Sequence, residues 1–565
     1  MMTIACENRL ATAALLGLSL LMPLAQAADP AHPNTAVVTP PGYLQTDEGQ
    51  TFQLPPVKID PVTPAAIGST ERVRIERVDF CGNTVLTTAE LQLIAAPYVR
   101  RVVTAAELET LRHALSKAYV DRGYVSSGVL LPKQIVDGVL VFEVVEGRLS
   151  AIRLHGMERL DERYVSRRLA PEKDEPLNME QLRERFQLLL ADPLFSRLNA
   201  RLSPGVAPGE AILDVDVTRA SSSQFSVFAN NYRPASIGSE SVGVSALVRN
   251  LTTQGDVLEA SVQTPPHRGL GTRSALAWQM PLGFSGTSLN IALERGSSSV
   301  IEEPAKLLDI RSSLSSRDIG VSQRLFESLS QKLVIGLNRV SRENRTWLLG
   351  EPFSFTPGEP SGVTQESLWR FWQDYSVRSE TQVLALRSTL SYGNNSLQDI
   401  AGLPDANGPA RQFHLWVGQA QFGRLMMANG AQLIVRATVQ HTGDRLLSLD
   451  GLALGGVNTV RGYRENQLVR DKGAYFNVEF EYPLWREASD GLSLTLIPFY
   501  DHGWAQNIGE ERFALSSLGL SSRLQWQRLN LDLVLAKRLN YPGFVNGSGS
   551  SLQDQGVHLQ MGYKF

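Results

Sequence analysis

The sequence has few cysteines and no marked excess of charge of either sign. Its 565 residues include two cysteines and carry a formal net charge of −3. Because the charge is nearly balanced, composition gives no indication of a nucleic-acid partner, and we expect none. Cys6 lies in a leader segment, so Cys81 is the single cysteine of the mature chain and cannot form an internal disulfide. We expect Cys81, at the end of a strand-like run, to be a small buried residue.

Long apolar runs are also missing, apart from one at the N-terminus. No other run reaches the roughly 18 residues of a membrane helix, which argues against a helical membrane protein. This absence does not bear on a membrane β-barrel, because barrel strands alternate and give a weak hydropathy signal. Arg9, the apolar stretch 10–24 and Ala25-Gln26-Ala27 predict a signal peptide over residues 1–27. Residues 28–70 are rich in proline and predict an extended linker without an amphipathic helix.

The sequence lacks the motifs on which catalysis or cofactor binding is usually built. It contains no metal-spaced Cys/His set, no nucleophile elbow and no phosphate-binding loop. Asp501 and His502 are adjacent, but no nucleophile accompanies them. We therefore expect no enzyme, no catalytic residue, no cofactor and no metal.

A small α+β unit occurs twice in the N-terminal part of the chain. In residues 71–149 the pattern predicts a strand at 73–80, helices beginning near Thr88 and after Thr104, and strands near 128–131 and 138–145. Residues 150–220 repeat the order strand, helix, helix, strand, strand, with the elements expected at 151–155, 162–169, 179–192, 199–204 and 210–218. A repeat at a spacing of about seventy-five residues indicates two tandem domains.

From Ser222 onward, short alternating runs predict an all-β transmembrane barrel of 16 antiparallel strands over residues 222–565. The connections alternate between short turns and long loops, as expected for periplasmic turns and external loops. The long connections are 344–366, 394–409, 443–472 and 540–554. The sixteen predicted strands are 222–232, 239–250, 254–264, 271–281, 285–296, 307–325, 331–343, 367–378, 381–393, 410–424, 430–442, 473–485, 492–503, 513–526, 529–539 and 555–565.

The last of these runs has the clearest pattern. Apolar residues that suit a lipid-facing side alternate with polar or small residues that suit the lumen. The apolar set is Val557, Leu559, Met561, Tyr563 and Phe565, and the other set is His558, Gln560, Gly562 and Lys564. A separate aromatic cluster suits the interfacial belt of a membrane barrel: Trp369, Phe371, Trp372 and Tyr375. On these residues alone, the alternative is an aromatic cluster of a soluble protein.

The connection 443–472 is much longer than an ordinary hairpin loop, and such loops are usually functional. At its centre lies Val460-Arg461-Gly462-Tyr463, where the arginine is a fixed charge in need of a partner. About forty residues later, Phe499-Tyr500-Asp501-His502-Gly503 offers a carboxylate. The alternative is a solvated loop arginine and a turn aspartate. We predict that Arg461 pairs with Asp501 inside the lumen, that Gly462 allows a sharp turn, and that Tyr463 packs on the barrel wall.

Together, the signal peptide, the two α+β repeats and the barrel resemble the two-partner secretion transporters, the TpsB family with its ShlB- and FhaC-type members. This family belongs to the superfamily of the barrel-assembly protein BamA. In the first repeat the resemblance rests on Tyr119, Gly123, Tyr124, Pro132, Gln134, Gly138, Glu146 and Gly147. In the barrel it rests on the loop motif Val460, Arg461, Gly462 and Tyr463 and on its wall partner Phe499, Asp501 and Gly503.

The resemblance implies that residues 71–149 and 150–220 are POTRA domains 1 and 2, which lie in the periplasm and bind unfolded β-chains. The barrel would lie in the bacterial outer membrane, and the loop 443–472 would fold inward. Tyr563 and Phe565 resemble the signal by which the barrel-assembly machinery recognises its substrates. The implied function is secretion of a large TpsA-type partner, haemolysin- or adhesin-like, by a monomer in contact with outer-membrane lipid. The alternative is a BamA-type assembly factor.

Overall fold

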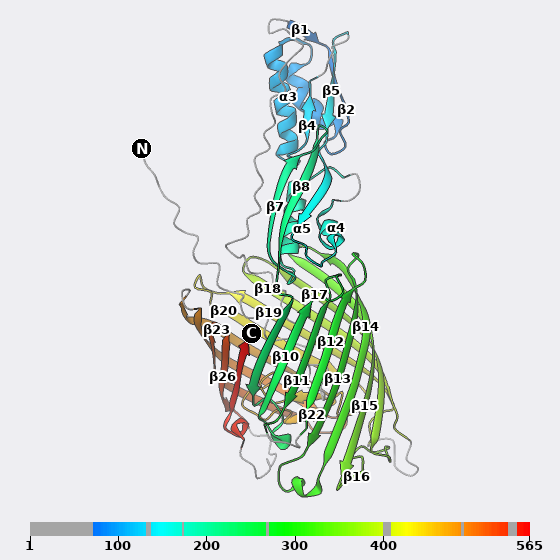
Figure 1. Ribbon diagram of the computed structural model, residues 1–565, viewed down its shortest axis with the longest axis vertical. Helices are drawn as coiled ribbons and strands as arrows, with labels where there is room; N and C mark the ends of the chain where they lie inside the picture. Colours follow the sequence, from blue (N-terminus) through cyan, green and yellow to red (C-terminus); the bar gives the residue numbers. More distant parts are fainter. Residues whose placement is uncertain are drawn as a thin grey trace. The chain divides into compact units, whose positions relative to one another are not determined.

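A computed structural model of the chain describes residues 72–131, 137–171, 175–266, 271–398, 408–487, 491–540 and 551–565 (Figure 1). The described residues form two compact units, divided between Ala220 and Ser221. The predicted signal peptide and linker lie outside the described residues. Among the helices that are described, none is both long and apolar enough to cross a membrane.

The first half of the N-terminal unit is a small sheet covered by two helices. Strands β2 (Arg77–Cys81), β5 (Val139–Val145) and β4 (Gly128–Leu130) form the sheet, with β2 parallel and β4 antiparallel to β5. Helices α2 (Thr88–Ala95) and α3 (Ala105–Val120) each begin with a capping box, Thr87 with Glu90 and Thr104 with Glu107. The core between sheet and helices is made of apolar side chains, among them Val78, Leu91, Leu108, Leu111, Leu115 and Phe142.

Two sequence expectations for this half are wrong. The predicted strand 73–80 is split at Glu76, because its backbone N–H bonds to the Gly138 carbonyl at 2.8 Å. The N-terminal piece, β1 (Arg72–Ile75), instead pairs with the unpredicted β3 (Arg101–Thr104). Cys81 is exposed rather than buried, since the alternation of β2 places it on the face opposite Val78.

The second half of the unit repeats this topology with a different sequence. Its elements are β6 (Arg148–His155), α4 (Glu162–Leu169), α5 (Met179–Leu190), β7 (Phe195–Pro204) and β8 (Glu210–Arg219). Here β6 is parallel and β7 antiparallel to the last strand, β8, as β2 and β4 are to β5. The same order and the same strand directions show that the unit contains one fold twice.

The second unit is a closed antiparallel barrel of sixteen spanning strands (Figure 1). The barrel closes where the last strand pairs with the first. In order, the strands are β9 (Ser223–Asn230), β10 (Ser241–Arg249), β11 (Val257–Thr264), β12 (Arg273–Pro281), β13 (Thr287–Ser299), β14 (Arg311–Glu327), β15 (Gln331–Leu348), β17 (Val363–Arg378), β18 (Gln382–Asn395), β19 (Gln412–Leu425), β20 (Gln432–His441), β23 (Lys472–Glu487), β24 (Leu492–Gln506), β25 (Phe513–Trp526), β26 (Leu529–Arg538) and β27 (Val557–Lys564).

About half of the predicted loop 344–366 is strand. β15 continues to Leu348 and β17 begins at Val363, with the short β16 (Glu351–Pro352) added to the end of β15. The sequence signal fails here because both faces of this extension are polar or mixed, so the apolar alternation that marks a spanning strand is lost. β14, β15 and β17 are therefore much longer than strands such as β9 or β10 (Figure 1).

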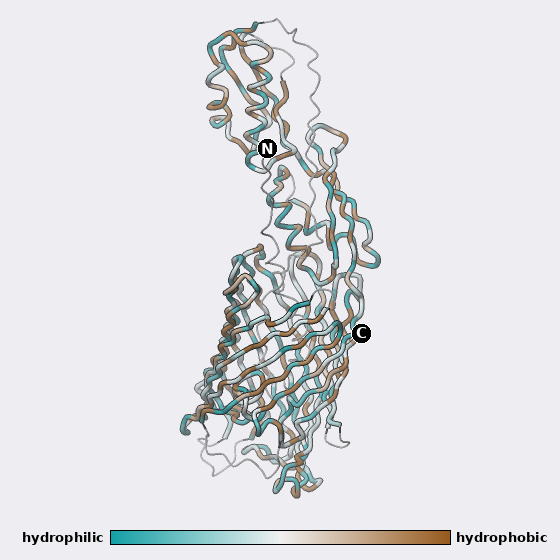
Figure 2. The backbone as a smooth tube through the Cα atoms, turned by 90° about the vertical axis from the view of Figure 1, so that its left-hand side faces the viewer, coloured by the Kyte–Doolittle hydropathy of each residue, from teal (hydrophilic) through white to brown (hydrophobic). Residues whose placement is uncertain are grey.

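Apolar and polar residues alternate along the barrel strands (Figure 2). In β27 the outward residues Leu559, Met561 and Tyr563 are exposed while His558 is fully buried, which confirms the predicted pattern. The aromatic cluster divides between the two faces. Trp369 and Phe371 point outward and are exposed. Trp372 instead donates to Asn338 at 2.9 Å on the lumen face, so it does not belong to a lipid-facing belt.

Candidate functional site

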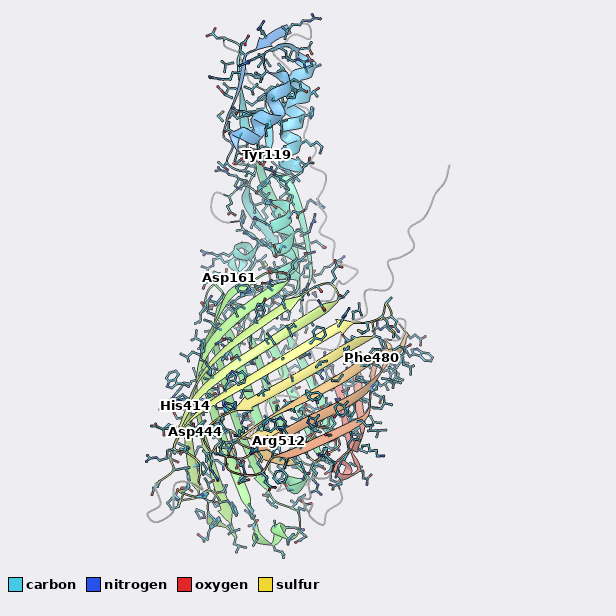
Figure 3. The ribbon with its side chains drawn as sticks, turned by 180° about the vertical axis from the view of Figure 1, so that it is seen from behind. Tyr119, Asp161, His414, Asp444, Phe480 and Arg512 are labelled. Carbon is cyan, nitrogen blue, oxygen red and sulfur yellow. The ribbon has the colours of Figure 1, made fainter. Side chains whose placement is uncertain are left out.

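The loop between β20 and β23, residues 442–471 (the lumenal loop), is folded and buried. It contains a two-stranded ribbon of β21 (Leu452–Leu454) and β22 (Leu468–Arg470). Leu454 and Val460 are fully buried and pack with Tyr475, Ala505 and other residues of the barrel wall. Figure 3 labels Asp444, just after the end of β20, where its carboxylate accepts the backbone N–H of His414 at 2.8 Å. A solvated external loop would not bury apolar residues such as Leu454 and Val460, so this loop occupies the barrel lumen.

Arg461 bonds the lumenal loop to two strands of the barrel wall. Its Nε donates to Oδ2 of Asp501, on β24, at 2.7 Å, and its Nη2 donates to Oδ1 of the same carboxylate at 2.6 Å. Arg461 and Asp501 therefore form a bidentate pair. The Arg461 backbone N–H also donates to Asp501, at 3.0 Å. Its Nη1 lies 2.7 Å from Oε1 of Glu479 on β23, and the guanidinium carbon lies 3.5 Å from the centre of the Phe499 ring. The loop arginine and the wall aspartate thus meet, and Phe499 supplies the aromatic surface beneath the cation.

Two wall residues of this site were not anticipated from the sequence. Oε1 of Glu479 is paired with Arg461, and its Oε2 accepts from Arg436 at 2.7 Å. Asn477 donates to Asp501 at 2.8 Å and to the Thr459 carbonyl at 2.5 Å, which joins the carboxylate to the loop backbone. The signal that could have found them is the alternation of β23, which places these two polar residues on its lumen face.

Gly462 meets the wall at a point where no side chain fits. Its φ of +89° lies in the region that favours glycine, and a Cβ built there would lie 2.9 Å from Cβ of Ala536. Its N–H donates to Nε2 of His558 at 3.1 Å, and its carbonyl accepts from Nε of Arg538 at 2.5 Å. The tip of the loop is therefore bonded to β26 and β27 as well as to β24.

Replacing Gly462 by alanine should displace this tip. The positive φ and the contact with Ala536 together cost about 1–3 kcal/mol. On the export function that the sequence resemblance implies, we expect a several-fold lower amount of exported partner protein in the medium. Folding of the barrel, checked by the heat-dependent shift in gel mobility, should be unchanged. Gly443→Ala is the matched control, because no atom lies within 4 Å of a Cβ at that glycine of the same loop. Equal effects of both substitutions would contradict the assigned role.

Tyr463 lies against the wall, as its position next to the turn suggested. The residue is 2% exposed, and its hydroxyl donates to the Ser516 carbonyl at 3.0 Å and lies 2.8 Å from Oδ1 of Asn540. Gly503 contributes by being small, because a Cβ there would lie 2.8 Å from the Tyr475 side chain and 3.3 Å from the loop residue Leu454.

Further charges of the loop reach other parts of the barrel. Arg464 donates to Asp554 at 2.6 Å, in the connection before β27, and to Glu302 at 2.8 Å, in the connection after β13. Asp450 accepts from Arg342 of β15 at 2.9 Å. The loop is thus attached to several widely separated strands. Sequence reasoning missed these contacts, since single charges in loops carry no signal of their partners.

The motif residues of the first repeat form a separate site around Glu146. Its carboxylate accepts the backbone N–H groups of Thr84 at 2.6 Å and Val85 at 2.8 Å and the hydroxyl of Tyr119 at 3.2 Å. Burial, together with the charge of Glu146, raises the pKa of Tyr119, so its hydroxyl stays protonated and donates. Figure 3 labels Tyr119, which lies near the C-terminal end of α3.

The remaining motif residues of this repeat are turn and junction residues. The carbonyls of Gly123 and Gly147 accept from Met179 at 2.9 Å and Leu177 at 2.7 Å, which connects the first repeat to the second. The Gly138 carbonyl accepts from Glu76, and the Tyr124 N–H bonds to the Tyr119 carbonyl. Pro132 and Gln134 lie outside the described residues.

Comparison with known families gives two matches in this chain. The profile of the "POTRA domain, ShlB-type" matches residues 73–147. The profile of the "Haemolysin secretion/activation protein ShlB/FhaC/HecB" matches residues 209–524, more than half of the chain.

Individual relatives are similar over most of their length. The outer membrane transporter CdiB of Dickeya dadantii is 21% identical, over 83% of this chain and 84% of the relative. The hemolysin transporter protein HpmB of Proteus mirabilis is 22% identical, over 87% of each chain. Among solved structures, CdiB from Escherichia coli superposes with a TM-score of 0.67 at 19% identity, covering 90% of this chain and 94% of that one.

Proposed function

The chain belongs to the haemolysin secretion/activation protein family ShlB/FhaC/HecB, and on this premise we propose that it exports one large TpsA-type partner protein. It is an outer-membrane transporter of two-partner secretion. The finer proposal is that the partner is a haemolysin- or adhesin-like protein that crosses the barrel unfolded. The lumenal loop, held in the lumen by Arg461, is the observation that carries this proposal.

The physical requirements of such export agree with the architecture. A closed barrel leaves no unpaired strand edge in lipid, and sixteen strands enclose a lumen wide enough for an extended chain. The periplasm holds no ATP, so transport needs another source of free energy. We propose that folding of the partner outside the cell supplies it, as a repetitive β-fold can form progressively from one end.

Within the lumen, the proposed role of the motif Val460–Tyr463 is to fix the loop in a transport-competent position. The supporting contacts are the bidentate pair of Arg461 with Asp501 and the bonds of Gly462 to His558 and Arg538. A buried ion pair of this kind specifies one arrangement of the loop more than it adds stability.

For the N-terminal unit we propose that residues 71–149 and 150–220 are POTRA domains 1 and 2. They would receive the partner as an added strand, a mode that depends mainly on backbone hydrogen bonds. The available edges are β2 and β4 in the first sheet and β6 and β7 in the second. We further propose a monomeric transporter without enzymatic activity, assembled through the signal that ends in Tyr563 and Phe565.

Deleting the gene for this chain tests the function. We expect one very large protein to disappear from the culture medium while the other outer-membrane proteins keep their abundance. A general loss of outer-membrane proteins would instead favour a BamA-type assembly factor, and the export proposal would be wrong.

A further inference from the structure

Three outward-facing arginines form a diagonal row on neighbouring strands of the barrel. Arg295 lies on β13, Arg317 on β14 and Arg339 on β15, and all three are exposed. In the strand register, Arg295 is opposite Ser315, two residues from Arg317, and Arg317 is opposite Ser341, two residues from Arg339. Consecutive arginines are therefore diagonal neighbours on one face, at a spacing of roughly 7–8 Å between backbones.

The row lies along one border of an apolar surface. Next to the arginines on the same outward face are Leu293, Ile319 and Leu337, which are 40%, 52% and 49% exposed. Trp369, directly opposite Arg339, is 49% exposed, and the Arg339 guanidinium lies 5.1 Å from the centre of its ring. An exposed tryptophan beside arginines is typical of the boundary between hydrocarbon and headgroups.

Chain direction identifies this boundary as the external one. The connection between β14 and β15 at the other end is a short turn, residues 328–330, while the connections at the arginine end are the longer segments 300–310 and 349–362. Short turns are periplasmic and long loops external in such barrels. The arginines therefore face the outer leaflet.

A pocket of about 430 Å³ lies on the external side of the arginine row and is lined by residues of β14, β15, β17 and β18 and by Ser396, just after β18. Much of its lining is formed by side chains with hydroxyl, amide or guanidinium groups, such as Arg317, Ser341, Gln365, Ser367 and Asn394. Arg339 donates to the Ser367 hydroxyl. Two carboxylates also line the pocket. Glu343 is bonded to Arg345 at 2.8 Å and to Gln365 at 2.9 Å, and Glu366 accepts from Arg342 at 3.1 Å. The pocket thus offers hydrogen-bonding groups suited to sugar hydroxyls beside the Arg317 guanidinium, whose nearest carboxylate in the lining, Glu343, is already bonded to Arg345 and Gln365.

Among the residues that the structure describes, Arg295, Arg317 and Arg339 form no direct ion pair with a carboxylate, and Arg317 interacts only at longer range with Glu343, which is paired with Arg345. Like charges at neighbouring positions on a sheet repel one another. An anion between them would remove this repulsion, and arginine binds phosphate through paired N–H groups. We propose that this surface binds a phosphorylated glycolipid of the outer leaflet, with its phosphates on the arginine row, its sugars in the pocket and its acyl chains on the apolar surface.

The continuity of the two surfaces favours a lipid over a soluble anion. A free phosphate would use only the arginines and would leave Ile319, Leu337 and Trp369 without a role. An acylated headgroup covers both the charged row and the apolar residues directly beside it. The proposal depends on the outer-membrane location of the barrel and not on the identity of the exported partner.

The test uses the full chain, purified in detergent and freed of endogenous lipid. Its unfolding midpoint is followed by the heat-dependent shift in gel mobility, with added deep-rough lipopolysaccharide, the same lipid after dephosphorylation, or inorganic phosphate. A ligand that binds only the folded state raises the midpoint. We expect lipopolysaccharide to raise the midpoint, and the dephosphorylated lipid and inorganic phosphate to have at most about half of that effect.

The double substitution Arg317→Gln/Arg339→Gln should remove at least about half of the shift caused by lipopolysaccharide. Arg317→Gln alone should reduce it, whereas Arg311→Gln should not. Arg311 is the matched control, since it lies on the same strand but is already paired with Asp309 at 2.8 Å. Arg317→Lys should retain part of the shift and replaces the glutamine variant if that variant does not fold.

Three results would overturn the proposal. The first is an undiminished lipopolysaccharide shift in the double variant. The second is an equal shift with the dephosphorylated lipid, which would mean that the acyl chains alone bind. The third is an equal shift with inorganic phosphate, which would identify a simple anion site.

Discussion

Replacing Asp501 by asparagine should lower the amount of exported partner in the medium about tenfold or more. Arg461 would lose its bidentate partner while it stays 5% exposed, and removing one member of a buried pair usually costs about 3–5 kcal/mol. Because Glu479 still holds Nη1, we expect a smaller cost, about 2 kcal/mol, which shifts the ratio of docked to undocked loop roughly thirtyfold. We propose that the docked loop is needed for export, so export falls with it.

Secreted partner in the medium is compared with the folded transporter in the membrane, measured by gel mobility. Asp309→Asn is the matched control, since it removes the same charge from an exposed loop residue paired with Arg311, and export should change less than about twofold. A double-mutant cycle with Arg461→Ala and Asp501→Ala separates direct pairing from independent effects. Strictly additive losses would contradict the pairing.

The second large effect is expected from Glu146→Ala in the first repeat. This substitution leaves the N–H groups of Thr84 and Val85 and the buried Tyr119 hydroxyl without their acceptor. Each buried donor left unsatisfied costs about 1–3 kcal/mol, and partial access of water reduces the sum to about 2–4 kcal/mol. For a small domain this is a large share of its stability. We expect the first repeat to become sensitive to proteases and export to be largely lost.

Limited proteolysis of the full chain, followed by mapping of the earliest cleavage sites, checks this prediction. Glu143→Ala is the control, because Glu143 lies on the same strand, β5, with its side chain on the exposed face. Early cleavage within residues 72–147 is expected only in the Glu146 variant. Wild-type resistance in that variant would show that the carboxylate does not hold the β2–α2 connection in place.

Much of the architecture follows from local patterns in the chain. The alternation in β27 is a direct consequence of lipid on one side and lumen on the other, so the sequence determines that strand with little ambiguity. The capping boxes at Thr87 and Thr104 similarly identify the starts of α2 and α3 from a few neighbouring residues. Where a strand extends beyond the membrane, as β15 does after residue 343, both of its faces are polar or mixed, so the pattern is lost and the prediction fails.

The orientation of side chains was harder to predict from the sequence than the presence of a strand. Tryptophan is typical of an interfacial belt, yet Trp372 lies on the lumen side of the sheet, where it donates to Asn338. Cys81 has the character of a core residue, but the break at Glu76 sets the phase of β2 and turns Cys81 outward. A shift of one residue reverses the face of every side chain in a strand, so orientation depends on where the strand begins.

The sequence by itself determined the barrel, the repeated N-terminal fold, and the arginine and aspartate that meet in the lumen. Only the tertiary structure decided what surrounds that pair: Glu479 and Asn477 beside it, and Arg464 bonded to Glu302, 162 positions away. It also decided the outward arginine row, which exists only because the register of β13, β14 and β15 places three separate residues side by side. The alternation of a strand depends only on consecutive residues. These contacts depend on barrel closure and strand register, which join residues far apart in the chain.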